Sequence, residues 1–145
     1  MASQPLRILV ALDFSSEAGR ALRTARDLAR RTSAELTILH VRPVSDIRAA
    51  IQEGRDDLLK GTTAALRSAL EEHFAGRFTA LARQRERPLL LRGKPGLEIC
   101  REARRGGYNL IVMGSRGRGR VASALLGSTA QEVLSQSRVS VLVAR

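Results

Sequence analysis

The chain has 145 residues, one cysteine and a formal net charge of +11. A chain of this length folds as one domain, and 43% apolar residues are enough for a core, which excludes wholesale disorder. The lone Cys100 excludes an internal disulfide and, with it, a disulfide-stapled secreted scaffold. The N-terminus lacks the basic start and long apolar stretch of a signal peptide, and no apolar run approaches the roughly 20 residues that span a bilayer. We therefore expect one soluble, cytoplasmic domain over residues 1–145 with no membrane partner.

The positive charge is carried by arginine: among 25 basic residues only Lys60 and Lys94 are lysines, and the arginines are spread along the whole chain. Strong basic charge is typical of nucleic-acid-binding proteins. Proteins that bind single strands also use aromatic side chains as stacking platforms, and this chain offers few. These are Phe14, Phe74, Phe78 and Tyr108. The pattern favours a solvated arginine-rich surface, with a basic nucleic-acid-binding domain as an alternative.

The first half of the chain begins with a short apolar run over residues 6–12, which predicts a strand buried on both faces. Residues 13–16 break the run, and Ser15 or Ser16 can cap a helix whose apolar residues recur at spacings of three and four. Residues 36–41 predict a second strand, closed by Arg42 and Pro43.

A long helical stretch is expected over residues 47–85. Glycines at positions 54, 61 and 76 weaken the expectation that it is continuous, because each costs about 1 kcal/mol relative to alanine in a helix. We expect Pro88 to end this helix and residues 89–91 to form a third strand.

The second half continues the alternation. Residues 93–96 read as a turn whose Pro95 starts a helix over 97–105, and Gly106 and Gly107 end that helix. Residues 110–113 predict a fourth strand, residues 128–137 a helix and residues 139–144 a fifth strand. Strands that alternate with helices in this way predict an α/β domain with one open, five-stranded parallel sheet and helices on both faces.

Ligands of open parallel sheets bind beyond the carboxyl ends of the strands, where the strand order reverses. The residues that follow the predicted strands are therefore candidates, and only the loop that begins at Gly114 has a distinctive sequence. Its glycines allow the backbone to approach a ligand, and the loop leads Gly127, Ser128 and Thr129 into a helix N-terminus, which favours phosphate. Three arginines add positive charge around it. They are Arg116, Arg118 and Arg120.

Two other phosphate motifs fit less well. No Gly-Lys-Ser/Thr sequence is present, which excludes a P-loop. Residues 117–122 match the loose G-x-G-x-x-A dinucleotide pattern, but no acidic residue ends a neighbouring strand at the expected distance downstream. A dinucleotide oxidoreductase is therefore the weakest alternative.

The whole loop resembles the universal stress protein family, whose nucleotide-binding members carry G-x2-G-x9-G-S/T after the fourth strand. Gly114, Gly117, Gly127 and Ser128 have this spacing. The likeness covers the entire chain, including residues 8–13, 39–41 and 110–117. It implies a Rossmann-like fold of the adenine nucleotide alpha hydrolase type with strand order 3-2-1-4-5.

The resemblance also implies a ligand, ATP, which can carry Mg²⁺ without a metal site built by the protein. Asp13 and the backbone of Ala11, Leu12 and Val41 would hold the adenosine part. A loop would pass beneath ribose and phosphates, and a helix start would take the phosphates. The loop residues are Met113, Gly114, Ser115, Arg116 and Gly117, and the helix-start residues are Gly127, Ser128 and Thr129.

The activity so implied is that of a stress-response switch or sensor with at most slow ATP hydrolysis, because no water-orienting carboxylate or glutamine is expected beside the γ-phosphate. No catalytic residue is assigned. The resemblance further implies a homodimer through the apolar edge strand over residues 139–143. The next hypothesis, ahead of the nucleic-acid-binding domain, is a family member that binds no nucleotide and acts mainly through protein interaction.

Several candidate residues also have structural interpretations. Asp13 can cap the turn that follows it, and Ser128 with Gln131 or Thr129 with Glu132 can form a capping box. His40 is expected to be a strand-end histidine and Cys100 a core residue. The sequence also departs from the family at Phe14, which either crowds the mouth of the site or packs beneath the base, and at residues 137–140, which lack the proline common there.

Overall fold

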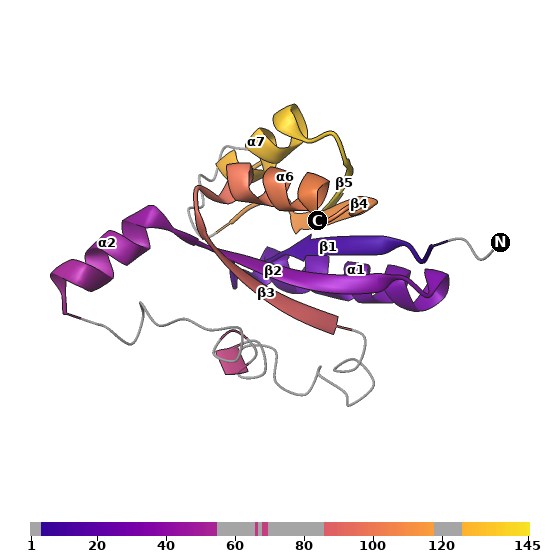
Figure 1. The fold of residues 1–145 in the computed structure, drawn as a ribbon, viewed down its shortest axis with the longest axis horizontal. Coiled ribbons are helices and arrows are strands. Elements are labelled where there is room, and N and C mark those ends of the chain that lie inside the picture. The colour runs from indigo at the N-terminus through magenta and orange to yellow at the C-terminus, as the bar shows by residue number, and fades with distance from the viewer. Residues whose placement is uncertain (1–3, 55–65, 67, 70–85, 118–125) are drawn as a thin grey trace.

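The computed structural model describes residues 4–54, 66, 68–69, 86–117 and 126–145 (Figure 1). The strands are β1 (Arg7–Ala11), β2 (Glu35–Pro43), β3 (Glu86–Gly93), β4 (Leu110–Gly114) and β5 (Ser140–Ala144). The helices are α1 (Ser16–Thr32), α2 (Val44–Gln52), α6 (Pro95–Arg105) and α7 (Ser128–Gln136). All four strand pairings are parallel, and the sheet order is β3-β2-β1-β4-β5, which confirms the predicted fold class and strand order.

Helices cover both faces of the sheet (Figure 1). On one face α1 packs its small residues and Leu22 against Val10, Ile38 and Val112. On the other face α6 and α7 pack Ile99 and Val133 against the opposite side chains of the same strands. Leu9, Leu39 and Ile111 are fully buried there. The central strands are therefore buried on both faces, as their continuous apolar runs predict.

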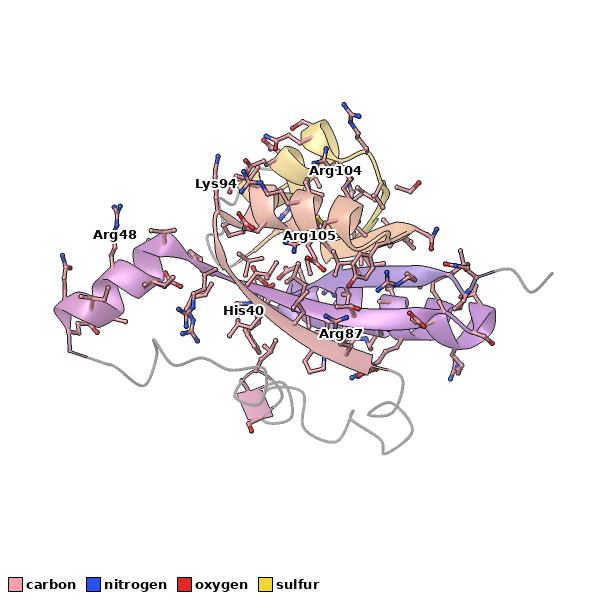
Figure 2. All side chains as sticks on the ribbon, viewed as in Figure 1. His40, Arg48, Arg87, Lys94, Arg104 and Arg105 are labelled. Atoms are coloured by element: carbon pink, nitrogen blue, oxygen red, sulfur yellow. The ribbon has the colours of Figure 1, made fainter. Side chains whose placement is uncertain are left out.

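Helix α1 shows how local sequence sets an element beside the site. The Ser15 hydroxyl accepts a hydrogen bond from the Ala18 N–H at 3.2 Å, so Ser15 is the N-cap. The helix ends where Ser33 adopts a left-handed conformation with φ of 55°. Its arginines lie largely on the exposed side. Arginines of the other helices are exposed as well, among them Arg48, Arg104 and Arg105, which are labelled in Figure 2.

The predicted long helix over residues 47–85 is wrong as a continuous element. Helix α2 begins at Val44 and ends at Gln52, and Gly54 follows with a positive φ of 65°. Much of the stretch lies outside the described residues, but Leu66 is helical and packs into the core beside α1. Glycine at position 54 thus ends the helix because it reaches a backbone conformation that other residues avoid.

Pro88 does not end a helix but lies inside β3, two residues after the strand begins at Glu86. It pairs in register with Ile38 of β2 and is buried. Proline has no N–H to donate, so within a sheet it is confined to edge strands, strand starts and bulges. In the described sheet β3 is an edge strand, which explains why the proline is accepted there.

Among the described residues, no helix is both long enough and apolar enough to cross a membrane.

Candidate functional site

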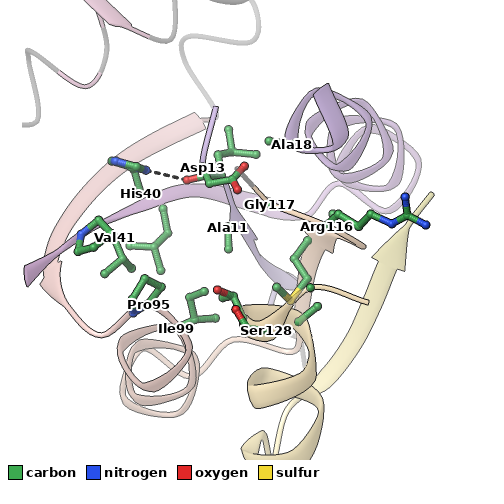
Figure 3. Close-up of a pocket in the computed structure, with 18 of the residues that line it drawn as sticks. Ala11, Asp13, Ala18, His40, Val41, Pro95, Ile99, Arg116, Gly117 and Ser128 are labelled. Atoms are coloured by element: carbon green, nitrogen blue, oxygen red, sulfur yellow. Dashed lines mark hydrogen bonds between the residues drawn. The ribbon is translucent and has the colours of Figure 1, made fainter. Parts of the chain in front are cut away.

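A pocket of about 340 Å³ opens at the carboxyl end of the sheet, where the strand order reverses between β1 and β4 (Figure 3). Its walls come from the ends of three central strands and from the starts of α1, α2, α6 and α7. The sequence-predicted residues that line it are Ala11, Leu12, Asp13, Val41, Met113, Gly114, Arg116, Gly117, Gly127, Ser128 and Thr129. The topology therefore gathers these residues around one cavity.

Ser115 is the one sequence-predicted residue that does not line the pocket. It is 7% exposed, and its N–H donates to the Ala144 carbonyl at 3.1 Å. Its own carbonyl accepts from the Gly127 N–H at 2.7 Å. Ser115 thus joins the end of β4 to β5 and to the start of α7, and it shapes the pocket without facing it.

The turn from β1 into α1 presents Asp13 to the pocket. One carboxylate oxygen of Asp13 accepts from the Ser15 N–H at 3.0 Å and from the Ser15 hydroxyl at 2.6 Å. These hydrogen bonds confirm the prediction that Asp13 caps the turn that follows it. The same carboxylate lines the pocket, so the structural and ligand-facing roles coexist.

Phe14 is not among the pocket-lining residues. It adopts a left-handed conformation with φ of 64° and packs with the core beside α1. Its ring meets the His40 ring edge-on at 4.9 Å between centroids. The expectation that Phe14 crowds the mouth or packs beneath a base is thus wrong, because the turned backbone sends its side chain to the α1 side of the sheet.

The motif glycines are held by contacts within the protein. A Cβ on Gly114 would lie 2.9 to 3.1 Å from Glu17, including its backbone, so Gly114 lets α1 approach β4. A Cβ on Gly127 would meet the Arg116 Cα at 3.3 Å and the Gly117 nitrogen at 3.4 Å. These glycines are therefore needed for close packing of the loop, helix and strand around the pocket. The sequence alone predicts only that they let a ligand approach the backbone.

Helix α7 begins at the pocket without a side-chain cap. Its N-cap is Gly127 and it makes no side-chain cap bond, so both predicted capping boxes are wrong. Gln131 instead donates from Nε2 to the Leu126 carbonyl at 3.1 Å. Ser128 is already the first helical residue, so its hydroxyl is not placed to cap the next turn. The first-turn N–H groups have no carbonyl partner within the helix, and the positive end of the helix dipole faces the pocket.

The rest of the lining has an apolar part and a charged part. The apolar wall is formed by residues of β2 and α6, namely Leu39, Val41, Pro95 and Ile99. Two carboxylates, Asp13 and Asp46, also line the pocket. The Arg116 side chain runs away from the pocket in Figure 3, which differs from the charge expected around a phosphate. Arg118 and Arg120 lie outside the described residues.

Sequence reasoning missed part of the lining. The added residues are Ala18, Leu39, His40, Pro43, Asp46, Pro95, Ile99 and Ala130. Pro43 is the last residue of β2 and Asp46 lies in the first turn of α2, so the rule that ligands bind beyond strand ends could have found them. Pro95 lies two residues after the end of β3, so the same rule covers it, whereas Ile99 reaches the site because α6 packs on the sheet.

Metal ligation and the lone cysteine remain to be placed. Within the part of the chain that the structure describes, no group of three or more His, Cys, Asp or Glu residues could hold a metal ion. Cys100 is only partly buried and lies 4.0 Å from the Val133 carbonyl. Burial raises the pKa of its thiol, and the nearby Glu132 carboxylate raises it further. Cys100 therefore belongs to the contact between α6 and α7 rather than to a ligand set.

Residues 6–145 match the family model described as "Universal stress protein family". The chain is 35% identical over 144 residues to a universal stress protein of Thermus aquaticus, covering 95% of this chain and 97% of that protein. It is 30% identical over 151 residues to the universal stress protein YxiE of Bacillus subtilis, covering 96% and 98%.

Solved structures agree with the fold. The structure of the protein MJ0577 superposes with a TM-score of 0.76 at 26% identity, covering 96% of this chain and 94% of that one. Two solved structures with lower TM-scores contain adenine nucleotides. A universal stress protein in complex with cAMP has a TM-score of 0.65 at 24% identity and covers 99% and 98% of the two chains. One from Archaeoglobus fulgidus in complex with dAMP has a TM-score of 0.60 at 22% identity and covers 97% and 98%. Family model, relatives and sheet order agree, and the chain belongs to the universal stress protein family.

Proposed function

We propose that this universal stress protein binds ATP in the pocket at the carboxyl end of its sheet and acts as a nucleotide-dependent switch or sensor. One observation carries the proposal: a single cavity has an apolar wall at one side and the N-terminus of α7 at the other. A planar base suits the apolar wall, and phosphates suit unpaired amides and a positive helix end. The cAMP and dAMP complexes of two proteins of the same fold support the nucleotide class.

In this proposal the nucleotide lies across β1. The adenosine part contacts Asp13 and the backbone of Ala11, Leu12 and Val41. The segment from Met113 to Gly117 passes beneath ribose and phosphates. Gly127, Ser128 and Thr129 receive the phosphates at the start of α7. In this arrangement eleven of the twelve predicted residues surround one ligand. Ser115 does not face the ligand, and its backbone hydrogen bonds hold the loop in place.

A magnesium ion would enter with the phosphates. The pocket lining offers two carboxylates, and one oxygen of Asp13 is already engaged by Ser15. Nucleotide oxygens and water would therefore supply most of the ligands of such an ion. We propose at most slow hydrolysis and a role that depends on binding.

Calorimetric titration of the chain with ATP, in the presence and absence of Mg²⁺, tests the proposal. We expect saturable binding at millimolar affinity or tighter, with about one site per chain. Ser128→Pro is the informative variant, because proline is accepted at the first helical position but removes one N–H from the phosphate end. Gly127 has an extended backbone, ψ of 161°, which suits a residue before proline.

Ser128→Ala is the matched control, because it keeps the N–H and removes only the hydroxyl. We expect Ser128→Pro to weaken ATP about tenfold, as for a lost charge-assisted hydrogen bond, while both variants remain folded. Absence of any millimolar binding by the wild-type chain would end the proposal.

We also propose a homodimer through β5. This strand is an edge of the described sheet, and its middle residues Val141, Leu142 and Val143 are only partly buried. The other edge, β3, carries Pro88 and the exposed Arg87 and Arg92, which are features that discourage edge pairing. β5 carries neither a charge nor a proline, so it is the edge suited to a second copy.

A further inference from the structure

The ladder of hydrogen bonds between β1 and β2 ends unusually at the pocket. Leu12 donates its N–H to the Leu39 carbonyl at 2.8 Å, which continues the ladder one residue past β1. In a parallel ladder the next bond would run from the N–H of the residue two beyond Leu39, which is Val41, to the Leu12 carbonyl. Between these two described residues that bond is not formed.

The Leu12 carbonyl is instead occupied by a side chain. His40 Nδ1 lies 2.7 Å from the Leu12 oxygen (Figure 3). A carbonyl oxygen only accepts, so Nδ1 must carry the hydrogen. The edge-on contact with Phe14 packs the imidazole ring from the side of the turn. The ring therefore holds the position that the Val41 amide would otherwise take.

The consequence falls on Val41. Alternate residues of β2 direct their backbone groups toward β1, and Val41 follows Leu39 in that series. Val41 also lines the pocket. Its N–H thus faces the opening between the ends of β1 and β2, at the apolar side where a base would lie.

We infer that His40 is a positioning residue: by occupying the Leu12 carbonyl it keeps the Val41 N–H available to an acceptor atom of the bound base. This inference rests on the proposed nucleotide site and adds a side chain, outside the predicted set, that prepares it.

Two substitutions separate this role from a general contribution to folding. His40→Asn keeps an N–H donor at the same number of bonds from the backbone as Nδ1, whereas His40→Leu removes it. We expect His40→Asn to bind ATP within about threefold of wild type and His40→Leu to bind about tenfold more weakly. Thermal unfolding of both variants checks that each is folded.

Hydrogen exchange of the Val41 amide gives a readout that a purely structural role would not move. In the ligand-free wild-type chain we expect this amide to exchange rapidly, and in His40→Leu we expect it to be protected at least tenfold, because the Leu12 carbonyl is then free to accept it. A protected Val41 amide in the wild type, or unchanged ATP affinity in His40→Leu, would overturn the inference. If the wild-type chain binds no nucleotide, the proposed function fails, while the exchange measurement still decides what His40 does.

Discussion

Gly117 and Asp13 lie close together in the lining of the pocket: a Cβ built on Gly117 would lie 2.5 Å from one carboxylate oxygen of Asp13. The other oxygen of that carboxylate is held by Ser15, so the side chain cannot simply swing aside. The end of β1 and the loop after β4 therefore pack closely together, and this packing depends on a glycine at position 117 and an aspartate at position 13. This contact joins the two chain segments that the proposed ligand would bridge.

The contact predicts a coupling between two substitutions. Gly117→Ala should destabilise the fold by about 1–3 kcal/mol, because it forces a methyl group against the fixed carboxylate. In an Asp13→Ala background the same change should cost much less. Urea unfolding of the four proteins gives the coupling free energy. Equal costs in both backgrounds would show that Asp13 does not restrict position 117.

A second prediction concerns the ion pair that fixes the edge strand. Arg26 of α1 donates two hydrogen bonds to the Glu86 carboxylate of β3, from Nε to Oε1 at 2.6 Å and from Nη2 to Oε2 at 2.9 Å. The Glu86 side chain is 6% exposed. Glu86→Ala should cost about 3 kcal/mol, because it leaves a largely buried guanidinium without its carboxylate.

The controls for this pair use the same unfolding measurement. Arg101→Ala breaks an exposed pair with Glu98 and should cost less than about 1 kcal/mol. Arg26→Met combined with Glu86→Leu should recover most of the lost stability, because it removes both charges. A Glu86→Ala cost no larger than that of Arg101→Ala would contradict a buried, stabilising pair.

The thiol of Cys100 gives a prediction about pH. Burial, with a contribution from Glu132, raises the pKa of this thiol in the folded chain. Between the unfolded and folded pKa values, the native state keeps a proton on the thiol that the unfolded chain has lost. The thiol's contribution to the free energy of unfolding is therefore complete below the unfolded pKa and disappears as the pH rises through the folded pKa. Alkylation by iodoacetamide near pH 8 should therefore be slower in the native than in the urea-unfolded chain. Equal rates would contradict the shift.

The proposed dimer gives a prediction about β5. Ser115 donates to the Ala144 carbonyl, so Ala144, Leu142 and Ser140 direct their backbone toward β4, and Val141 directs its backbone outward. Val141→Pro should remove an outward N–H and leave the bonds to β4 intact. We expect light scattering to show a dimer for wild type and a monomer for this variant, with Val141→Thr as the control. A monomeric wild type at micromolar concentration would refute the dimer.

Much of the fold follows from the sequence because its strongest signals are local. Apolar runs at β1 and β4 mark buried strands, and their alternation with amphipathic helices sets a parallel sheet. The parallel sheet then places the pocket, since strand ends and a glycine-rich loop meet at one edge. That is why the predicted residues gather around one cavity.

The expectations that failed depend on contacts between distant segments. Pro88 is accepted because β3 is an edge strand, which the local sequence does not reveal. Gly114 lines the pocket as expected, but its close packing against Glu17 of α1 cannot be seen in the loop motif. The hydroxyls at 128 and 129 fail to cap because α7 begins at Ser128, one residue earlier than a Ser128 cap requires and two residues earlier than a Thr129 cap requires. Tertiary packing decided each of these points.

The most direct test of the proposed site is an amide chemical-shift titration of the ¹⁵N-labelled chain with ATP. We expect saturable shifts that centre on the Val41 amide and on the first-turn amides of α7, Ser128 to Ala130, with little change at the opposite end of the sheet around Glu35 and Asn109. Shifts that saturate at that opposite end, or no shifts at millimolar ATP, would show that ATP does not bind in this pocket.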